Sequence, residues 1–266
     1  MAFHRPAAYG IIPDPNDPFT CRTVPAQVYP MTSDPIDTDL PRPALRAYLL
    51  HRIEFGRCLA LQQRVARNMA TQLDGNISLL LCEHPNVITV GRDGSAAGMH
   101  FDAGLLRSRQ IEVHWVKRGG GCMLHTPGQL AVYPIVPLRW HGLSVGQFLD
   151  RFQSGLLAAL VDLGLHPELA TDGRGIMGRT GRIVSLGIAV RDWITSHGAF
   201  VNVNPSMGLF RLLESSRDEA SRMGCLVAER QQPVKMTSVR TELIRQLATA
   251  FGCDRYHLHT GHPLLR

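Results

Sequence analysis

The chain has 266 residues, of which 44% are hydrophobic and 19% are charged, and its formal net charge is +6. This composition is typical of a soluble globular protein, and the length fits one domain with an extension. The apolar runs are shorter than the roughly 20 residues of a membrane span, and neither a long Lys/Arg block nor a high aromatic content suggests nucleic-acid binding. The first residues carry no apolar signal region, so we expect a cytoplasmic protein that binds neither nucleic acid nor membrane.

The beginning of the chain is rich in proline, and nine of the 17 prolines lie within residues 1–43. Proline has no backbone N–H and favours extended conformations. We therefore predict an N-terminal arm at residues 1–44, one domain at residues 45–253 and a C-terminal tail at residues 254–266.

The rest of the chain mixes helical and strand patterns. Apolar residues recur at steps of three and four over residues 46–73, which predicts an amphipathic helix that ends at the Asp-Gly-Asn sequence of residues 74–76. Further patterns predict strands at residues 77–82, 87–90, 111–116, 129–137, 183–190 and 199–203, and helices at residues 145–163 and 238–251. Strands and helices do not alternate strictly, so we predict a mixed α/β or α+β fold rather than a doubly wound sheet.

Six cysteines are scattered along the chain, with no Cys-x-x-Cys pair and no histidine at ligand spacing. This spacing indicates neither a disulfide framework nor a metal site, and we expect reduced thiols, mostly buried. The cysteines are Cys21, Cys58, Cys82, Cys122, Cys225 and Cys253.

The most informative segment is Arg-Gly-Gly-Gly-Cys-Met-Leu-His-Thr-Pro-Gly-Gln-Leu at residues 118–130. Three consecutive glycines after a strand-like run let the backbone approach a ligand closely and turn its amides toward a carbonyl or anion, with Arg118 and His125 on either side. The segment therefore predicts a ligand cradle. The alternative is a glycine-rich turn with a surface arginine. A nucleotide phosphate loop is disfavoured because the required Lys-Ser/Thr or Gly-x-Gly-x-x-Gly context is missing.

Four segments in the same order resemble the octanoyltransferase family, which belongs to the wider lipoate and biotin protein ligase superfamily. They are Glu-His-Pro-Asn-Val-Ile-Thr-Val-Gly-Arg at residues 83–92, the glycine-rich segment at residues 118–130, Gly-Arg-Ile-Val-Ser-Leu-Gly at residues 181–187, and Ser-His-Gly-Ala-Phe-Val-Asn-Val-Asn at residues 196–204. The resemblance covers roughly residues 48–251. It implies a ligase-like fold with a mixed sheet flanked by helices.

The resemblance also implies an activity in lipoate biosynthesis. Such an enzyme takes an octanoyl group from acyl carrier protein, holds it as a thioester on a cysteine, and passes it to a lysine of a lipoyl domain, without a cofactor and as a monomer. His84 and Arg92 are expected to shape the site together with His125. The residues implied to line the acyl slot are Arg118, Gly119, Gly120, Gly121, Cys122, Met123, Leu124, His125, Ser185, Leu186, Gly187, Gly198, Ala199 and Phe200.

The sequence departs from the family pattern at the catalytic lysine, whose position is occupied by Arg182. Arginine keeps its proton at ordinary pH and cannot act as a base, although its charge can stabilise a thiolate. In the cradle, Met123 and Leu124 replace a Thr-Tyr pair, so the predicted pocket is more apolar than the family norm.

The position of the nucleophile has two alternatives. Alignment without gaps places the family's cysteine at Ser216, whereas an insertion of about nine residues places it at Cys225, after Met223 and Gly224. We predict Cys225 as the nucleophile and Arg182 as its partner. Cys122 is a third candidate because it lies inside the cradle.

Three functions are therefore open. The first is an active octanoyltransferase, and the second is a homologue that binds acyl chains or lipoyl domains without turnover. The third is an ATP-using ligase of the same superfamily, which adenylate formation would reveal. The net charge of +6 suits docking of an acidic acyl carrier protein.

Overall fold

The computed structural model describes residues 43–72, 74–94, 103–213 and 222–261. The chain divides into two units at Leu40 and Pro41, and everything below concerns the second unit. Residues 1–42 of the predicted N-terminal arm and the alternative nucleophile Ser216 lie outside the described residues. None of the described helices has the length and apolar character that crossing a membrane requires.

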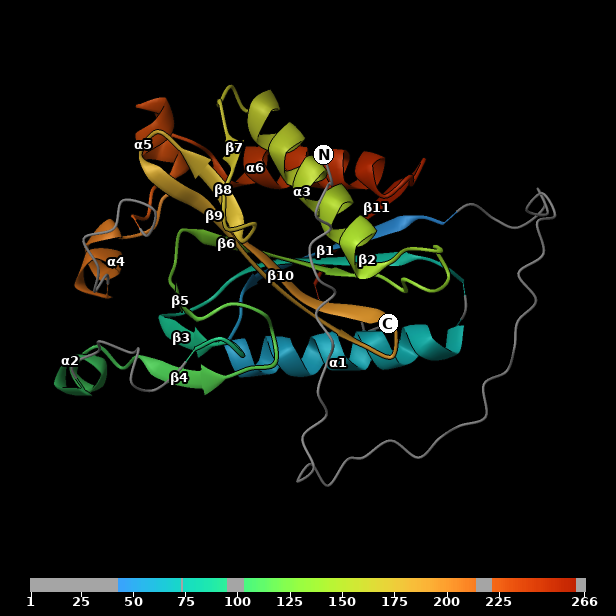
Figure 1. Cartoon of the computed structure of the whole chain (residues 1–266), viewed down its shortest axis with the longest axis horizontal. Coiled ribbons are helices and arrows are strands. Elements are labelled where there is room, and N and C mark those ends of the chain that lie inside the picture. Colours follow the sequence, from blue (N-terminus) through green and yellow to red (C-terminus); the bar gives the residue numbers. More distant parts are fainter. Residues whose placement is uncertain (1–42, 73, 95–102, 214–221, 262–266) are drawn as a thin grey trace, which may run out of the picture. The chain divides into compact units, whose positions relative to one another are not determined.

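The fold is built on an eight-stranded sheet with the order β11-β1-β2-β6-β10-β9-β8-β7 (Figure 1). Strands β11, β1 and β2 run parallel, and every later pairing is antiparallel, so the sheet is mixed, as the sequence predicts. The strands are β1 (Leu45–Arg52), β2 (Ile77–Glu83), β6 (Gln129–Ile135), β7 (Glu168–Leu169), β8 (Gly175–Gly178), β9 (Gly181–Arg191), β10 (Ile194–Asn202) and β11 (Tyr256–Thr260).

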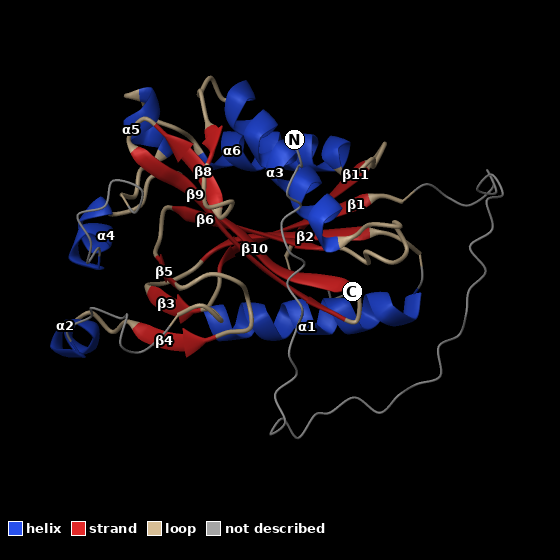
Figure 2. Ribbon diagram, in the orientation of Figure 1, coloured by secondary structure: helices blue, strands red, loops and turns tan. Residues whose placement is uncertain are grey.

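Helices cover both faces of this sheet. Figure 2 shows α1 (Phe55–Gln72) on one side and α3 (Val145–Asp162) with α6 (Met236–Ala250) on the other. Because successive side chains of a strand point to opposite faces, β2 contributes Leu79 and Leu81 to the core under α3 and α6, and Leu80 and Cys82 to the core under α1. The continuous apolar run of β2 is therefore explained by burial on both faces.

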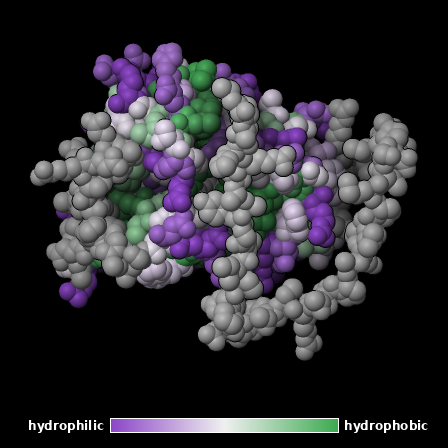
Figure 3. Space-filling model, viewed as in Figure 1, coloured by the Kyte–Doolittle hydropathy of each residue, from purple (hydrophilic) through white to green (hydrophobic). Residues whose placement is uncertain are grey.

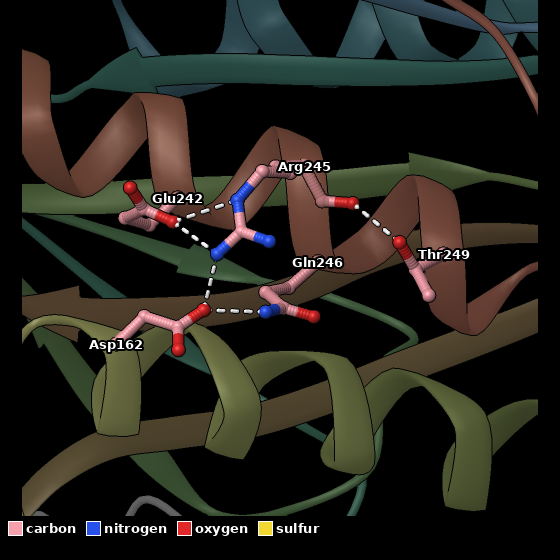
Figure 4. A network of polar contacts seen from close by, with 5 residues as sticks. All are labelled: Asp162, Glu242, Arg245, Gln246 and Thr249. Atoms are coloured by element: carbon pink, nitrogen blue, oxygen red, sulfur yellow. Dashed lines mark hydrogen bonds and ion pairs between the residues drawn. The ribbon is translucent and has the colours of Figure 1, made fainter.

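Helices α3 and α6 pack closely on each other. A Cβ at Gly155 of α3 would lie 2.8 Å from the Leu247 side chain of α6. Glycine has no Cβ and therefore avoids this steric clash. At the exposed edge of this contact, Asp162 accepts hydrogen bonds from Arg245 and Gln246, and Arg245 also pairs with Glu242 (Figure 4). Exposed ion pairs contribute little stability, so the packing of α3 on α6 is stabilised mainly by burial of their apolar faces.

A second sheet of three strands has the order β4-β3-β5. Its strands are β3 (Val87–Val90), β4 (Glu112–Trp115) and β5 (Cys122–His125). Helix α2 (Ala103–Ser108) precedes β4 in the chain, and the other short helices are α4 (Met207–Leu213) and α5 (Leu226–Arg230). Ile88 and Val90 of β3 form a small core with Leu209 and Phe210 of α4. The three glycines at residues 119–121 lie between β4 and β5, so this sheet carries part of the predicted cradle.

Two predictions about secondary structure are wrong. The first residues of the predicted helix 46–73 form strand β1, and the helix begins only at Phe55. β1 pairs with β2 on one side and β11 on the other, and this pairing overrides the helical spacing. The predicted tail contains β11, which closes the edge of the main sheet, and His259 stacks on Tyr48 with ring centroids 4.9 Å apart.

Exposed large hydrophobic residues are spread over several elements and loops of the described chain. Hydrophobic and hydrophilic residues are interspersed on the face drawn in Figure 3. Scattered apolar residues of this kind are normal for a protein surface. The exposed large hydrophobic residues are Trp115, Trp140, Val145, Val161, Leu169, Trp193, Tyr256 and Leu258.

Candidate active site

The guanidinium of Arg118 is the centre of the cradle. The side chain is fully buried, and its Nη2 donates to the carbonyl oxygen and the hydroxyl of Thr89 at 2.8 and 2.7 Å. Nη1 donates to the carbonyl oxygen of Gly119 at 2.9 Å. Burial lowers the pKa of Arg118 to about 10, so the group is still a cation at neutral pH. The alternative of a surface arginine is therefore wrong, and Arg118 is an internal support of the loop.

The glycine loop is folded back on the chain. The amide of Gly119 donates to the carbonyl of Ile188 at 2.9 Å, and the amide of Gly120 donates to the Asp93 carboxylate at 3.1 Å. Gly120 has a φ of +84°, in the region that favours glycine. Two of the three glycine amides are thus used inside the protein, which differs from the expectation that they face a ligand.

A chain of buried hydrogen bonds runs from Arg118 through His125. Thr89 Oγ1 lies 2.8 Å from His125 Nε2, and His125 Nδ1 lies 3.0 Å from Gln129 Oε1. An amide oxygen only accepts, so Nδ1 carries the proton and Nε2 accepts from the Thr89 hydroxyl. Burial first, and then the neighbouring His84 and Arg118, hold the pKa of His125 well below its usual value. His125 is therefore a neutral ring with both nitrogens in use.

The hydrogen-bond chain continues to the segment that contains the candidate nucleophile. Gln129 Nε2 donates to Asn202 Oδ1 at 2.8 Å. Asn202 Nδ2 in turn donates to the carbonyl oxygens of Gly224 at 3.0 Å and Arg182 at 3.4 Å. Asn202 is fully buried at the end of β10. It joins the cradle to both predicted catalytic positions.

The backbones of the two predicted catalytic residues lie side by side. The amide of Arg182 donates to the carbonyl of Arg222 at 2.8 Å, and the amide of Gly224 donates to the carbonyl of Arg182 at 3.0 Å. Met223 forms an isolated parallel bridge with Arg182. Cys225 follows directly, with a residue exposure of 5%. The guanidinium of Arg182 forms an ion pair with the Asp172 carboxylate at 2.7 Å, so the positive charge of Arg182 is paired with a negative one.

Comparison with known proteins identifies the family. Residues 55–248 match the lipoyl protein ligase A/B catalytic domain. The octanoyltransferase of Roseiflexus sp. (strain RS-1) is 32% identical over 213 residues, which are 79% of this chain and 88% of that protein. The octanoyltransferase of Geobacter metallireducens is 31% identical, over 80% of this chain and 97% of its own length. The chain belongs to the octanoyltransferase family.

Solved structures of lipoate protein ligases share the fold of this octanoyltransferase-family chain. A lipoate-protein ligase A bound with ATP has a TM-score of 0.67 at 16% identity and covers 83% of this chain and 89% of its own. The bi-partite lipoate protein ligase of Thermoplasma acidophilum also has a TM-score of 0.67, at 17% identity, with 82% and 87% covered. The predicted ligase-like fold is confirmed.

The other predicted slot residues of this octanoyltransferase-family chain lie on two neighbouring strands. Gly198, Ala199 and Phe200 of β10 pair with Gly187, Leu186 and Ser185 of β9. The Phe200 ring contacts His125, with ring centroids 4.1 Å apart, so Phe200 lies beside the cradle. Leu186 and Ala199 instead pack in the core under α3 and α6. The structure thus brings Phe200 to the cradle and turns Leu186 and Ala199 away.

Glycine at position 187 allows Arg118 and Gly119 of the cradle to pack closely against β9. A Cβ there would lie 2.9 Å from both the Arg118 side chain and the Gly119 carbonyl oxygen. Of the remaining predicted cradle residues, Met123 is half-buried, Leu124 is buried in the small core, and Cys122 is exposed. Although the residue is exposed, its thiol is partly desolvated, which raises the pKa of Cys122 and disfavours the thiolate that a nucleophile needs.

His84 lies beside His125 of the cradle. Its ring contacts His125, with centroids 6.1 Å apart, and Phe55. Arg92 belongs to the turn that pairs with the glycine loop, because its amide donates to the carbonyl of Arg118 at 3.0 Å. The Arg92 side chain is exposed, so its backbone makes the contact.

Four buried polar residues that support the site were not predicted. Thr89, Gln129 and Asn202 lie inside the segments that resemble the family, and their presence there was the signal that could have identified them. Glu229 of α5 accepts hydrogen bonds from the amides of Arg179 and Thr180 and from the Thr180 hydroxyl. It holds the β8–β9 turn, and with it Arg182, against the helix that follows Cys225.

Substitution of Gly198 by alanine is expected to lower the free energy of unfolding by about 1–3 kcal/mol, because overpacking forces the strands apart. The added Cβ would lie 2.0 Å from the carbonyl oxygen of Val132. Urea unfolding measures the change. Gly146→Ala is the matched control, since its Cβ would lie 3.9 Å from Ser144 Oγ in α3, and alanine favours a helix. Equal stability of the two variants would contradict the steric argument.

Proposed function

We propose that this chain transfers an octanoyl group from acyl carrier protein to a lysine of a lipoyl domain through a thioester on Cys225. The observation that carries the proposal is the buried hydrogen-bond chain that ends at Asn202, which joins the cradle to Gly224 and Arg182. The family relationship supports the same reaction. The enzyme acts in the cytoplasm as a monomer and uses no cofactor.

The first half of the reaction forms the acyl-enzyme. The Cys225 thiolate attacks the thioester carbonyl carbon of the octanoyl donor, and the carrier's sulfur leaves and takes a proton. One thioester replaces another, so no ATP is consumed. The apolar side chains of Met123 and Phe200 suit an acyl chain, each CH₂ of which gains about 0.8 kcal/mol on burial.

The second half passes the acyl group to the acceptor. The lysine amine attacks the Cys225 thioester, an amide bond forms, and the C–S bond breaks. Arg182 cannot accept the amine proton, and both nitrogens of His125 are already hydrogen bonded. The departing Cys225 thiolate therefore takes that proton itself. This assignment explains how arginine can stand where the family has lysine.

The test is to incubate the purified chain with octanoyl-acyl carrier protein, measure the intact mass, and map any octanoyl adduct by peptide mass spectrometry. We expect one adduct on Cys225 that moves to a lipoyl domain when the acceptor is added. Cys225→Ala is expected to abolish both steps. Ser216→Ala tests the other alignment, and Cys122→Ala tests the third candidate.

A matched control is Cys253→Ala, because Cys253 is a buried thiol in the core under α3 and α6. This variant is expected to keep full transfer. An adduct that persists in Cys225→Ala would assign the nucleophile to another residue. A folded chain that binds octanoyl-acyl carrier protein without any adduct would be a binding homologue, and adenylate formation from ATP and octanoate would indicate a ligase.

A further inference from the structure

A cluster of two cysteines and one histidine lies beneath α1. Cys58 of α1, Cys82 of β2 and His84 after β2 each offer one ligand atom, and these atoms lie within 4.8 Å of one another. All three residues are buried, at exposures of 0%, 0% and 2%. Cys58 and Cys82 are 24 residues apart in the chain, so no local spacing motif reveals the cluster.

The separations of the ligand atoms fit a tetrahedral zinc ion. The two Sγ atoms are 3.8 Å apart, and Cys82 Sγ is 3.7 Å from His84 Nε2. Bonds of about 2.3 Å to sulfur and about 2.0 Å to nitrogen at tetrahedral angles place two sulfurs about 3.8 Å apart, and a sulfur and a nitrogen about 3.6 Å apart. These two separations match tetrahedral coordination, and the third pair, Cys58 and His84, lies within 4.8 Å and closes by at most about 1 Å when one ion binds.

The histidine is oriented as a metal ligand. His84 Nδ1 lies 2.7 Å from the carbonyl oxygen of Ile53, and a carbonyl only accepts, so Nδ1 carries the proton. The lone pair of Nε2 then faces the cluster. A backbone carbonyl in this position is the usual partner of a zinc-bound histidine.

One further polar group lies at the cluster. The hydroxyl of Tyr133 on β6 lies 2.7 Å from His84 Nε2 and is fully buried. In the described structure it donates its hydrogen to that nitrogen, which has no other proton donor as close. Two ligands bound about 2.0 Å from one tetrahedral zinc ion are about 3.3 Å apart, so when a metal takes the nitrogen lone pair, the hydroxyl moves about 0.6 Å away from Nε2 to coordinate the ion.

We propose that Cys58, Cys82 and His84 bind one zinc ion, with Tyr133 as the fourth ligand. Binding replaces two S–H bonds by two metal–sulfur bonds and releases two protons to solvent. Two thiolates neutralise the charge of a divalent ion, which suits the apolar core that surrounds the cluster. Thiolate ligands select a soft metal such as zinc and disfavour magnesium or calcium.

The ion would fasten α1 to the main sheet behind the cradle. Cys58 comes from α1, Cys82 from β2 and Tyr133 from β6, and the His84 ring contacts His125. The site therefore has a structural role, since its four ligands leave no open position for substrate. This inference stands independently of octanoyl transfer, because the cluster shares no residue with the proposed nucleophile.

The test is a titration of the purified, metal-free full chain with Zn²⁺ against a chromophoric chelator. We expect one equivalent bound per chain, and Co²⁺ in its place is expected to show thiolate-to-cobalt charge-transfer absorption. Cys58→Ala and Cys82→Ala are each expected to lower the affinity at least about 100-fold. Cys253→Ala, which removes a buried thiol from the opposite face of the sheet, is expected to bind as the unaltered chain does.

Thermal unfolding gives a second readout that does not need the variants to fold. Zn²⁺ is expected to raise the Tm of the unaltered chain by at least about 5 °C, because an ion that binds only the folded state stabilises it. Failure of the unaltered chain to bind Zn²⁺ would overturn the proposal. Undiminished Zn²⁺ binding in both Cys58→Ala and Cys82→Ala would also overturn it. A disulfide between Cys58 and Cys82 that persists in metal-saturated protein would do the same.

Discussion

Replacement of Asn202 by alanine is expected to slow octanoyl transfer at least about 100-fold and to lower the free energy of unfolding by about 3 kcal/mol. The side chain is fully buried and makes three hydrogen bonds, to Gln129, Gly224 and Arg182. Its removal leaves a buried amide donor and two buried carbonyl oxygens without this partner, and each such loss costs about 1–3 kcal/mol. A shift of about 1 Å in the segment before Cys225 is enough for a 100-fold loss of rate.

Asn204→Ala is the matched control for this prediction, because Asn204 is exposed only two residues further along the chain. The control is expected to keep its rate and to change the unfolding free energy by less than about 0.5 kcal/mol. Urea unfolding and single-turnover transfer from octanoyl-acyl carrier protein measure the two effects. If Asn202→Ala transferred octanoyl groups as fast as Asn204→Ala, Asn202 would not position the nucleophile.

Acid is expected to destabilise the fold through His197. Burial, with a smaller contribution from the Arg118 cation, lowers the pKa of His197 from 6.5 to about 4. The unfolded state therefore binds more protons than the folded state between pH 6.5 and pH 4, and stability falls as the pH falls through this window. The contribution of His197 alone is a loss of about 2 kcal/mol at pH 5 and about 3 kcal/mol below pH 4.

His197→Asn isolates this contribution. His197 has a φ of +58°, and asparagine is among the residues that adopt this left-handed conformation most readily. The backbone amide at this position donates to Gln62 Oε1 at 2.8 Å, and the substitution preserves this bond. The free energy of unfolding, measured in urea from pH 7.5 to pH 4, is expected to fall less steeply in the variant than in the unaltered chain. Identical slopes would show that His197 is not buried in the neutral form.

The regular elements with strong local patterns were predictable. The pattern at residues 145–163 predicts a helix, and α3 spans Val145–Asp162, with a capping box formed by Ser144 and Gln147 at its start. The apolar run before Glu-His-Pro indicates a buried strand, and β2 spans Ile77–Glu83. Residues 45–52 and 256–260 carry weaker signals, and pairing in the sheet makes them strands: β1 with β2 and β11, and β11 with β1.

The candidate site was predictable in its segments and not in its connections. The resemblance identified the glycine-rich segment and Arg182, but only the fold shows that Arg118 is an internal support. The neutral state of His125 also depends on its neighbours in space, which are far from it in the chain. Asn202 links the cradle to the predicted catalytic positions because its side chain lies where the segments of Gln129, Arg182 and Gly224 meet.

The sequence by itself determined the family and the mixed sheet, because ordered motifs and local periodicity are properties of neighbouring residues. The tertiary structure alone decided the edge strand β11, the hydrogen-bond chain from Arg118 to Gly224, and the cluster of Cys58, Cys82 and His84. Each of these depends on side chains or backbones that are distant in the chain and meet only when the sheet has formed. Hydrogen bonding and metal coordination act over a few ångströms, so they follow spatial contact rather than sequence spacing.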